Sequence, residues 1–119
     1  MCIKYDEYDL LWLFESEPRV FDDHGYDGNV HCCRSLNDFK IIFNFDKYEH
    51  SGWVILNYLN NCIFAADFKE ITSLQKYEES LIISVKEEPV LKLNFKNQLA
   101  IELISEEDKK WYKDILLSD

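Results

Sequence analysis

The sequence has no long run of apolar residues. No uninterrupted apolar stretch is longer than that from Leu10 to Phe14, whereas a membrane-spanning helix needs about 20 such residues. No N-terminal apolar segment flanked by basic residues is present, as a secretory signal would require. We therefore expect a cytoplasmic protein that has no membrane partner.

Basic residues are scarce as well. The chain has 13 lysines and arginines against 23 acids, which gives a formal net charge of -10. Such a charge repels the phosphates of nucleic acids and anionic membrane surfaces. We exclude nucleic acid as a partner, and a basic protein is the natural complement.

Motifs for catalysis and nucleotide binding are absent. The chain contains no Gly-rich phosphate loop, no G-x-S-x-G and no H-E-x-x-H. Paired carboxylates carry no information in a chain with 23 acids. We expect no enzymatic activity and no cofactor.

One turn-rich segment, FDDHGYDGNVHCC, collects residues that could bind a metal or act as nucleophiles. His24, His31, Cys32 and Cys33 are ligand types suited to zinc, but adjacent cysteines on a strand point to opposite faces. A catalytic thiol would need a nearby histidine and a lowered pKa, whereas the surrounding acids raise it. We expect neither a metal site nor a nucleophile here.

The size of the chain suits one globular domain. Its 119 residues, 47% of them hydrophobic, can bury a core without disulfides, so we assign residues 1–119 to a single domain. The four cysteines are expected to be reduced thiols. Cys62 is expected in the core, as a small hydrophobic residue.

Most apolar residues alternate with polar ones, a pattern typical of strands with one buried face. In DFKIIFNFD, the side chains of Phe39, Ile41, Phe43 and Phe45 share a face. GWVILNYLNNCIFAADF predicts a hairpin that turns at Asn60-Asn61, since asparagine tolerates positive φ. SLIISVKEEPVLKLNFKNQLAIELIS predicts three strands, with turns at Glu88-Pro89 and Lys96-Asn97.

Two segments are less regular. YDLLWLFES fits either a short helix that stops before Pro18 or a strand with Leu10, Trp12 and Phe14 inward, and we favour the strand. ADFKEITSLQKYEES is interpreted as irregular or as holding a turn of helix.

The C-terminal segment SEEDKKWYKDILL predicts a helix. Ser105 is its N-cap, acids follow in the first turn, and Tyr112 and Leu116 form an apolar pair, as do Trp111 and Ile115. The fold class is therefore mainly β (α+β), with about seven antiparallel strands as a sandwich or partly open barrel and one C-terminal helix.

The closing segment LAIELISEEDKKWYKDIL resembles the last strand and helix of pleckstrin-homology-like domains. In that family, lysines and arginines near the first hairpin hold lipid headgroups. Here that region carries mostly acids, with Arg19 and Arg34 as its permanent cations. The resemblance concerns the fold and does not extend to the ligand.

Acidic residues are concentrated near the amino end. Residues 1–38 hold nine acids against three bases, a local net charge of -6, while the other 81 residues carry -4. Tyr5, Tyr8, Phe21 and Tyr26 are interleaved with these acids. Aromatic side chains among carboxylates suit a protein interface toward a basic cleft. The candidate binding residues are Asp6, Glu7, Asp9, Glu15, Glu17, Asp22, Asp23, Tyr26 and Asp27.

This profile of a small, acidic domain without catalytic motifs resembles the immunity proteins of bacterial contact-dependent inhibition and polymorphic toxin systems. The resemblance implies a monomer that binds its cognate toxin one-to-one, with the toxin a basic nuclease whose groove is covered by the acidic and aromatic surface. Two alternatives remain open. One is a nucleic-acid mimic or regulatory adaptor that binds a host enzyme, and the other is a small enzyme or metal-binding domain that uses the histidine and cysteine segment.

Overall fold

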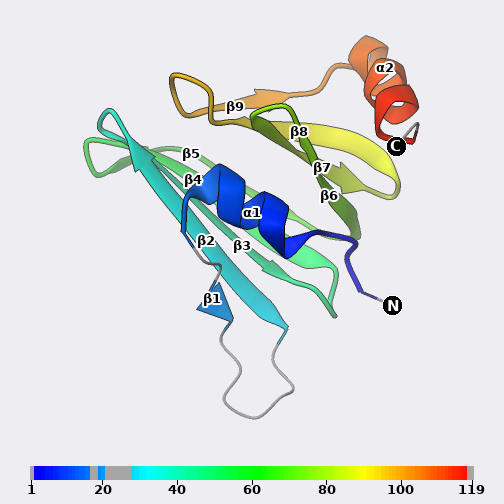
Figure 1. Ribbon diagram of the computed structural model, residues 1–119, viewed down its shortest axis with the longest axis horizontal. Coiled ribbons are helices and arrows are strands. Elements are labelled where there is room, and N and C mark those ends of the chain that lie inside the picture. Colours follow the sequence, from blue (N-terminus) through cyan, green and yellow to red (C-terminus); the bar gives the residue numbers. More distant parts are fainter. Residues whose placement is uncertain (1, 17–18, 21–27, 118–119) are drawn as a thin grey trace.

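The computed structural model describes residues 2–16, 19–20 and 28–117, and two antiparallel sheets dominate it (Figure 1). Glu17 and the residues from Asp22 to Asp27, with Tyr26, lie outside the described residues. The predicted mainly β class is confirmed. Nine strands occur in the part of the chain that the structure describes, and one of them has only two residues.

The first sheet has five strands in the order β1-β2-β3-β4-β5, so each strand pairs with its neighbour in sequence. Its strands are β1 (Arg19–Val20), β2 (Asn29–Leu36), β3 (Phe39–Asp46), β4 (Ser51–Tyr58) and β5 (Asn61–Phe68). The face predicted for β3 is confirmed, because Ile41, Phe43 and Phe45 are fully buried. The predicted hairpin of β4 and β5 is confirmed too.

The second sheet has four strands in the order β6-β7-β8-β9. Its strands are β6 (Ile71–Tyr77), β7 (Ser80–Val85), β8 (Glu88–Asn94) and β9 (Ala100–Leu103). The three strands predicted from SLIISV to LAIELIS are confirmed as β7, β8 and β9. Strand β6 was not predicted, because the segment was interpreted as irregular. Its only buried side chains, Ile71 and Leu74, are three residues apart across a register shift, which obscures the alternation.

One hydrophobic core lies between the two sheets. It joins Val30, Phe43 and Val54 of the first sheet to Leu81 and Leu93 of the second. The sheets do not close into a barrel, and the helix α1 (Glu7–Phe14) contacts both β2 and β6 between them (Figure 1). The fold is thus an open sandwich with a helix at one side.

The N-terminal segment is the main correction to the fold. YDLLWLFES forms α1 and not a strand, so the described chain has two helices where one was expected. The segment is helical because a helix buries Leu10, Leu13 and Phe14 together, and all three are at most 2% exposed. Their spacing of three and four residues places them on one face of the helix. A strand would have buried Trp12, which is 55% exposed.

The C-terminal helix α2 (Glu106–Leu117) is confirmed. The amide of Asp108 donates to Ser105 Oγ at 3.2 Å, which is the predicted N-cap. Tyr112 and Leu116 pack with Ile82 in a second cluster, so α2 covers the outer face of the four-stranded sheet. Trp111 stays 49% exposed, although its ring meets Tyr77 edge-on.

Several turns use residues other than glycine, of which the chain has only three. Asn37-Asp38, Leu59-Asn60 and Lys86-Glu87 each have positive φ at both positions, as two-residue primed turns require. The turns predicted at Asn60-Asn61 and Glu88-Pro89 therefore lie one and two residues too late. The long side chains at Leu59, Lys86 and Glu87 gave no local signal for positive φ.

Two further residues differ from expectation on the strand surfaces. Cys62 was expected in the core, but it is exposed because it lies on β5 at the edge of the first sheet. Strand alternation in LAIELIS places Leu99 and Leu103 on one face, but Leu103 is 76% exposed whereas Leu99 is buried.

Gly52 in β4 is required where the two sheets approach each other. A Cβ at this position would lie 2.8 Å from the Asn44 carbonyl oxygen and 3.1 Å from Ile71 Cδ1 of the second sheet. Any larger residue would push apart the strands that hold the shared core.

Candidate protein-binding site

Helix α1 begins at a local signal in the acidic segment. The Asp6 carboxylate accepts a hydrogen bond of 2.8 Å from the Tyr8 amide and caps the helix, and Glu7 and Asp9 lie in its first turn. Acids at these positions complement the positive end of the helix dipole. The helix ends at Glu15, which adopts the left-handed conformation with φ 55°.

The side of α1 that faces away from the core carries large apolar side chains. Tyr8 is 80% exposed, Trp12 55% and Leu11 39%. Their spacing of three and four residues places them on one stripe of the helix. We define the α1 surface as these three residues with the acids around them, Asp6, Glu7, Asp9 and Glu15.

The structure brings together four of the predicted binding residues, Asp6, Glu7, Asp9 and Glu15, on this short helix and its two caps. The other five, Glu17, Asp22, Asp23, Tyr26 and Asp27, lie outside the described residues. Tyr5, which the sequence also placed among the acids, turns toward the core, where its ring meets Phe45 edge-on at 5.1 Å. Burial raises the pKa of Tyr5.

Leu11 and Trp12 were missed as surface residues. Interpreting the segment as a strand placed Trp12 inward, and Leu11 was given no role. The signal that would have found them is the helical period: once Leu10, Leu13 and Phe14 are assigned to the core, Leu11 and Trp12 fall on the opposite side.

The acids of α1 are close enough to influence one another. The pKa of Asp9 is raised above its ordinary value, mainly by burial and then by the nearby Asp6 carboxylate. The positive charge of Lys76 acts in the opposite direction and lowers this pKa. A cationic group that approached both carboxylates would offset this repulsion. Lys76 also places its Nζ 4.5 Å from the centroid of the Trp12 ring, a cation–π geometry that holds the indole at the surface.

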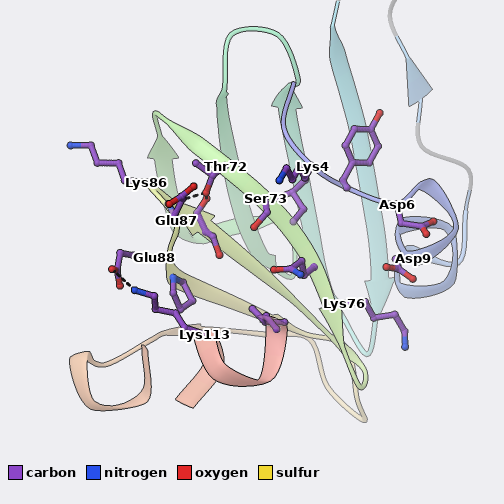
Figure 2. Close-up of a pocket in the computed structure, with 16 residues that line it drawn as sticks. Lys4, Asp6, Asp9, Thr72, Ser73, Lys76, Lys86, Glu87, Glu88 and Lys113 are labelled. Atoms are coloured by element: carbon purple, nitrogen blue, oxygen red, sulfur yellow. Dashed lines mark hydrogen bonds and ion pairs between the residues drawn. The ribbon is translucent and has the colours of Figure 1, made fainter. Parts of the chain in front are cut away.

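Hollows flank α1 on two sides. The larger, about 660 Å³, extends along β6 from the start of α1 to the end of α2 (Figure 2). The smaller, about 390 Å³, is lined by Leu11, Trp12, Glu15 and Arg34, among others. Helix α1 therefore stands between two depressions that side chains of a partner could enter.

The larger hollow has mixed charge. Its lining includes four lysines and four acids, and Figure 2 shows Asp6 and Asp9 at one end and the Glu88–Lys113 pair at the other. The hydrogen bond between Lys113 and Glu88, 2.8 Å long, lowers the pKa of Glu88 and raises that of Lys113. The excess negative charge therefore lies on the α1 surface and not along the whole hollow.

Arg34 of β2 holds the C-terminal end of α1 in place. Its Nη1 donates to the Leu13 carbonyl oxygen at 2.8 Å and its Nη2 lies 3.3 Å from Glu15 Oε1. The guanidinium also lies 5.7 Å from the centroid of the Phe95 ring. A cation at this end complements the negative end of the helix dipole. Arg34 thus fixes the position from which α1 presents its acids.

The histidine and cysteine segment divides over the two faces of β2, as predicted from strand geometry. Cys32 points into the core, while His31, on the other face, approaches the Trp53 ring at 6.3 Å. His24 lies outside the described residues. In residues 2–16, 19–20 and 28–117, no group of three or more histidines, cysteines and acids could hold a metal ion. Burial raises the pKa of Cys32 to about 12, with the neighbouring Cys33 adding to the shift.

The comparisons with known proteins give one result on the fold. No protein-family model and no curated protein matches the sequence. One chain of a contact-dependent growth inhibition toxin–immunity protein complex from Klebsiella pneumoniae 342 has a similar fold, with a TM-score of 0.69 and 18% identity. The similarity covers 86% of this chain and 96% of that one.

No helix within the described ranges is long and apolar enough to cross a membrane.

The first prediction concerns Arg34. Arg34→Ala should lower the free energy of unfolding by about 1.5–3 kcal/mol, because it removes a charged hydrogen bond to a helix end in a largely buried position. Glu15→Ala removes only the exposed half of the ion pair and should change stability by less than about 1 kcal/mol. Urea denaturation followed by tryptophan fluorescence measures both. Equal losses in the two variants would contradict the anchoring role of Arg34.

The second prediction concerns the thiols. With its high pKa and buried side chain, Cys32 has almost no reactive thiolate at mildly alkaline pH. In the native protein a disulfide reagent should therefore modify the exposed Cys2 and Cys62 first, and Cys32 only after denaturant is added. Peptide mass spectrometry identifies the sites, and Cys62→Ser removes one of the fast thiols as a control. Modification of native Cys32 as fast as Cys62 would refute the assignment.

Proposed function

We propose that this chain is an immunity protein that binds and neutralises a cognate toxin domain of a contact-dependent growth inhibition system. The observation that carries the proposal is the fold similarity, which spans nearly the whole of a chain from a toxin–immunity protein complex. The charge of the sequence supports it independently. The protein acts in the cytoplasm by binding alone and uses no cofactor.

The charge favours the role of immunity protein over that of toxin. A chain with a net charge of -10 repels the phosphates of a nucleic-acid substrate and attracts a basic protein. A nuclease domain needs the opposite charge in its substrate groove. We therefore propose that the toxin is a nuclease with a basic groove, and that carboxylates of this chain lie where substrate phosphates would lie.

The α1 surface is the proposed contact. Asp6, Glu7, Asp9 and Glu15 steer the basic partner, and Tyr8 and Trp12 supply apolar area that a partner can bury. Trp12 is the stronger anchor, because Lys76 already orders its ring and little entropy is lost on binding. Repulsion between Asp6 and Asp9 in the free protein is relieved when a cationic side chain binds between them.

The same proposal includes the predicted binding residues that follow α1 in the sequence, which are Glu17, Asp22, Asp23, Tyr26 and Asp27. They follow α1 and precede β2, the strand whose Arg34 holds the helix. We propose that this segment contacts the toxin together with the α1 surface, with Tyr26 as a further anchor.

Co-expression with the product of the neighbouring gene tests the class of function. We expect the two proteins to co-purify as a complex with one toxin per chain, and growth to be rescued in cells that express the toxin. Rescue distinguishes this proposal from the alternative of a nucleic-acid mimic that binds a host enzyme. A neighbouring product that neither binds nor inhibits growth would contradict the immunity role.

The third prediction tests the surface. The double variant Glu7→Gln and Asp9→Asn should slow association with the toxin about two- to tenfold and reduce its salt dependence, because it removes two steering charges. The capping residue Asp6 is kept, and relief of its repulsion with Asp9 offsets part of the lost dipole interaction, so the melting temperature should fall only slightly. Stopped-flow kinetics at several salt concentrations measures the rate.

A matched control places the same charge change on the other helix. Glu107→Gln with Asp114→Asn removes two exposed acids from α2, on the outer face of the second sheet. This variant should associate at nearly the rate of the unmodified protein. Equal slowing by both pairs would show that only net charge matters and that α1 is not the contact.

A further inference from the structure

The four outer edges of the two sheets differ in how far they are open. Strand β1 has two residues and pairs with Val30 and His31 of β2. Beyond them β2 contacts α1 and the residue after its cap, since Ser16 Oγ donates to the Cys33 carbonyl and Arg34 to the Leu13 carbonyl. Strand β9 has four residues.

The edge of β6 is occupied by the N-terminal segment, where the Lys4 amide donates to the Thr72 carbonyl and Lys4 accepts from the Leu74 amide. Strand β5 has eight residues and, within the described ranges, pairs with β4 alone. It is the long edge with an unpaired row of backbone groups.

The β5 edge has few of the features that usually protect such a strand. It contains no lysine and no proline, and Asp67 is its only charged residue. A register shift between Leu56 and Asn57 leaves Ile63 as an extra residue near one end, where it is 55% exposed. From Phe64 to Phe68 the pairing with β4 is regular. The regular part of the edge, Phe64 to Phe68, therefore has one acid as its protection and favours the addition of another strand.

Net charge restricts where a second copy of the chain could add its strand. Two copies of this chain repel each other with a net charge of -10 each, so they can meet only where charge is sparse. Residues Asn61 to Ala66 are uncharged, and Phe64 to Phe68 carry one acid, Asp67. We propose that β5 is the interface of a two-fold symmetric dimer, in which the β5 strands of two copies pair antiparallel and join the two five-stranded sheets.

The side chains of β5 suit pairing with a copy of itself. In an antiparallel pair, residues directly opposite each other face the same side of the sheet. In a two-fold dimer of β5 this holds only if one residue lies opposite its own copy, and we name the axis after that residue. An axis at Ala66 places Phe64 opposite Phe68 of the second copy, and both phenylalanines are partly buried against the core. The same register places Asp67 opposite Ala65, whereas an axis at Asp67 would oppose two carboxylates.

The dimer is compatible with toxin binding at the α1 surface. Helix α1 packs against β2, and β5 is three strands away at the other edge of the sheet. Each copy can therefore bind one toxin while its β5 edge is paired. The inference concerns the protein alone and does not depend on the proposed function.

The fourth prediction is tested by sedimentation velocity on the purified chain over a range of protein and salt concentrations. We expect a dimer whose association strengthens with salt, because screening reduces repulsion between two acidic copies. Binding of a basic toxin should weaken with salt, so the two interactions respond in opposite directions. A wild-type chain that stays monomeric throughout would overturn the dimer and leave the proposed function untouched.

Substitutions at the exposed Ala65 test the edge and its register. Ala65→Glu places a carboxylate opposite Asp67 of the second copy and should raise the dimer dissociation constant at least about fivefold. Ala65→Lys offers that carboxylate a cation and should dimerise at least as well as wild type. Leu103→Glu, the control, adds the same charge to another exposed strand position and should leave most of the dimer intact. Thermal melting confirms that all three fold.

The outcomes decide between β5 and other interfaces. Dimerisation of Ala65→Glu as strong as that of Leu103→Glu would overturn the use of β5. Loss of the dimer in Ala65→Lys would overturn the Ala66 register. A monomeric wild type in which Ala65→Glu weakens toxin binding would assign the edge to a strand of the toxin and would also overturn the dimer.

Discussion

The packing of α1 between the two sheets is the constraint on which the candidate surface depends. Leu10, Leu13 and Phe14 enter the core shared by the sheets, and the Phe14 ring meets Phe95, the residue after β8, at 4.9 Å. Arg34 of the first sheet fixes the C-terminal end of the helix. Because both sheets hold α1, the side that faces solvent has a defined orientation, although the helix has only eight residues. An isolated helix of this length would be only marginally stable.

Much of the fold follows from the sequence because its signals are local. Alternation identified β3, β4 and β5 of the first sheet, and Ser105 with its following acids identified α2, whereas β1 and β2 were not predicted. The N-terminal segment was misassigned because Leu10, Trp12 and Phe14 satisfy the strand period while Leu10, Leu13 and Phe14 satisfy the helical one. The Asp6 cap is a local signal for the helix, and the core, in which Leu13 is buried, confirms that choice.

The candidate site was predictable in its charge but not in its apolar part. Counting acids located Asp6, Glu7, Asp9 and Glu15, since any segment with that composition remains largely exposed. Leu11 and Trp12 required the helical phase, and the role of Arg34 required the position of β2 beside the helix. The open edge at β5 also required the strand order, because the sequence of a hairpin strand does not show which strands end a sheet.

Charge is distributed so that two kinds of contact are separated. Acids and exposed aromatic side chains share α1 at one end of the strand order, while the uncharged part of β5 lies at the other. In the proposed arrangement, a basic partner binds the first region, and an equally acidic second copy can approach only at the second. The same net charge would then favour one interaction and limit the other.

Hydrogen–deuterium exchange of the chain alone and bound to its toxin tests the central claim most directly. The account predicts that the strongest protection on binding falls on peptides covering residues 6–15, with little change over residues 106–117. Protection concentrated on α2 or on the outer face of the second sheet, with α1 unchanged, would contradict it.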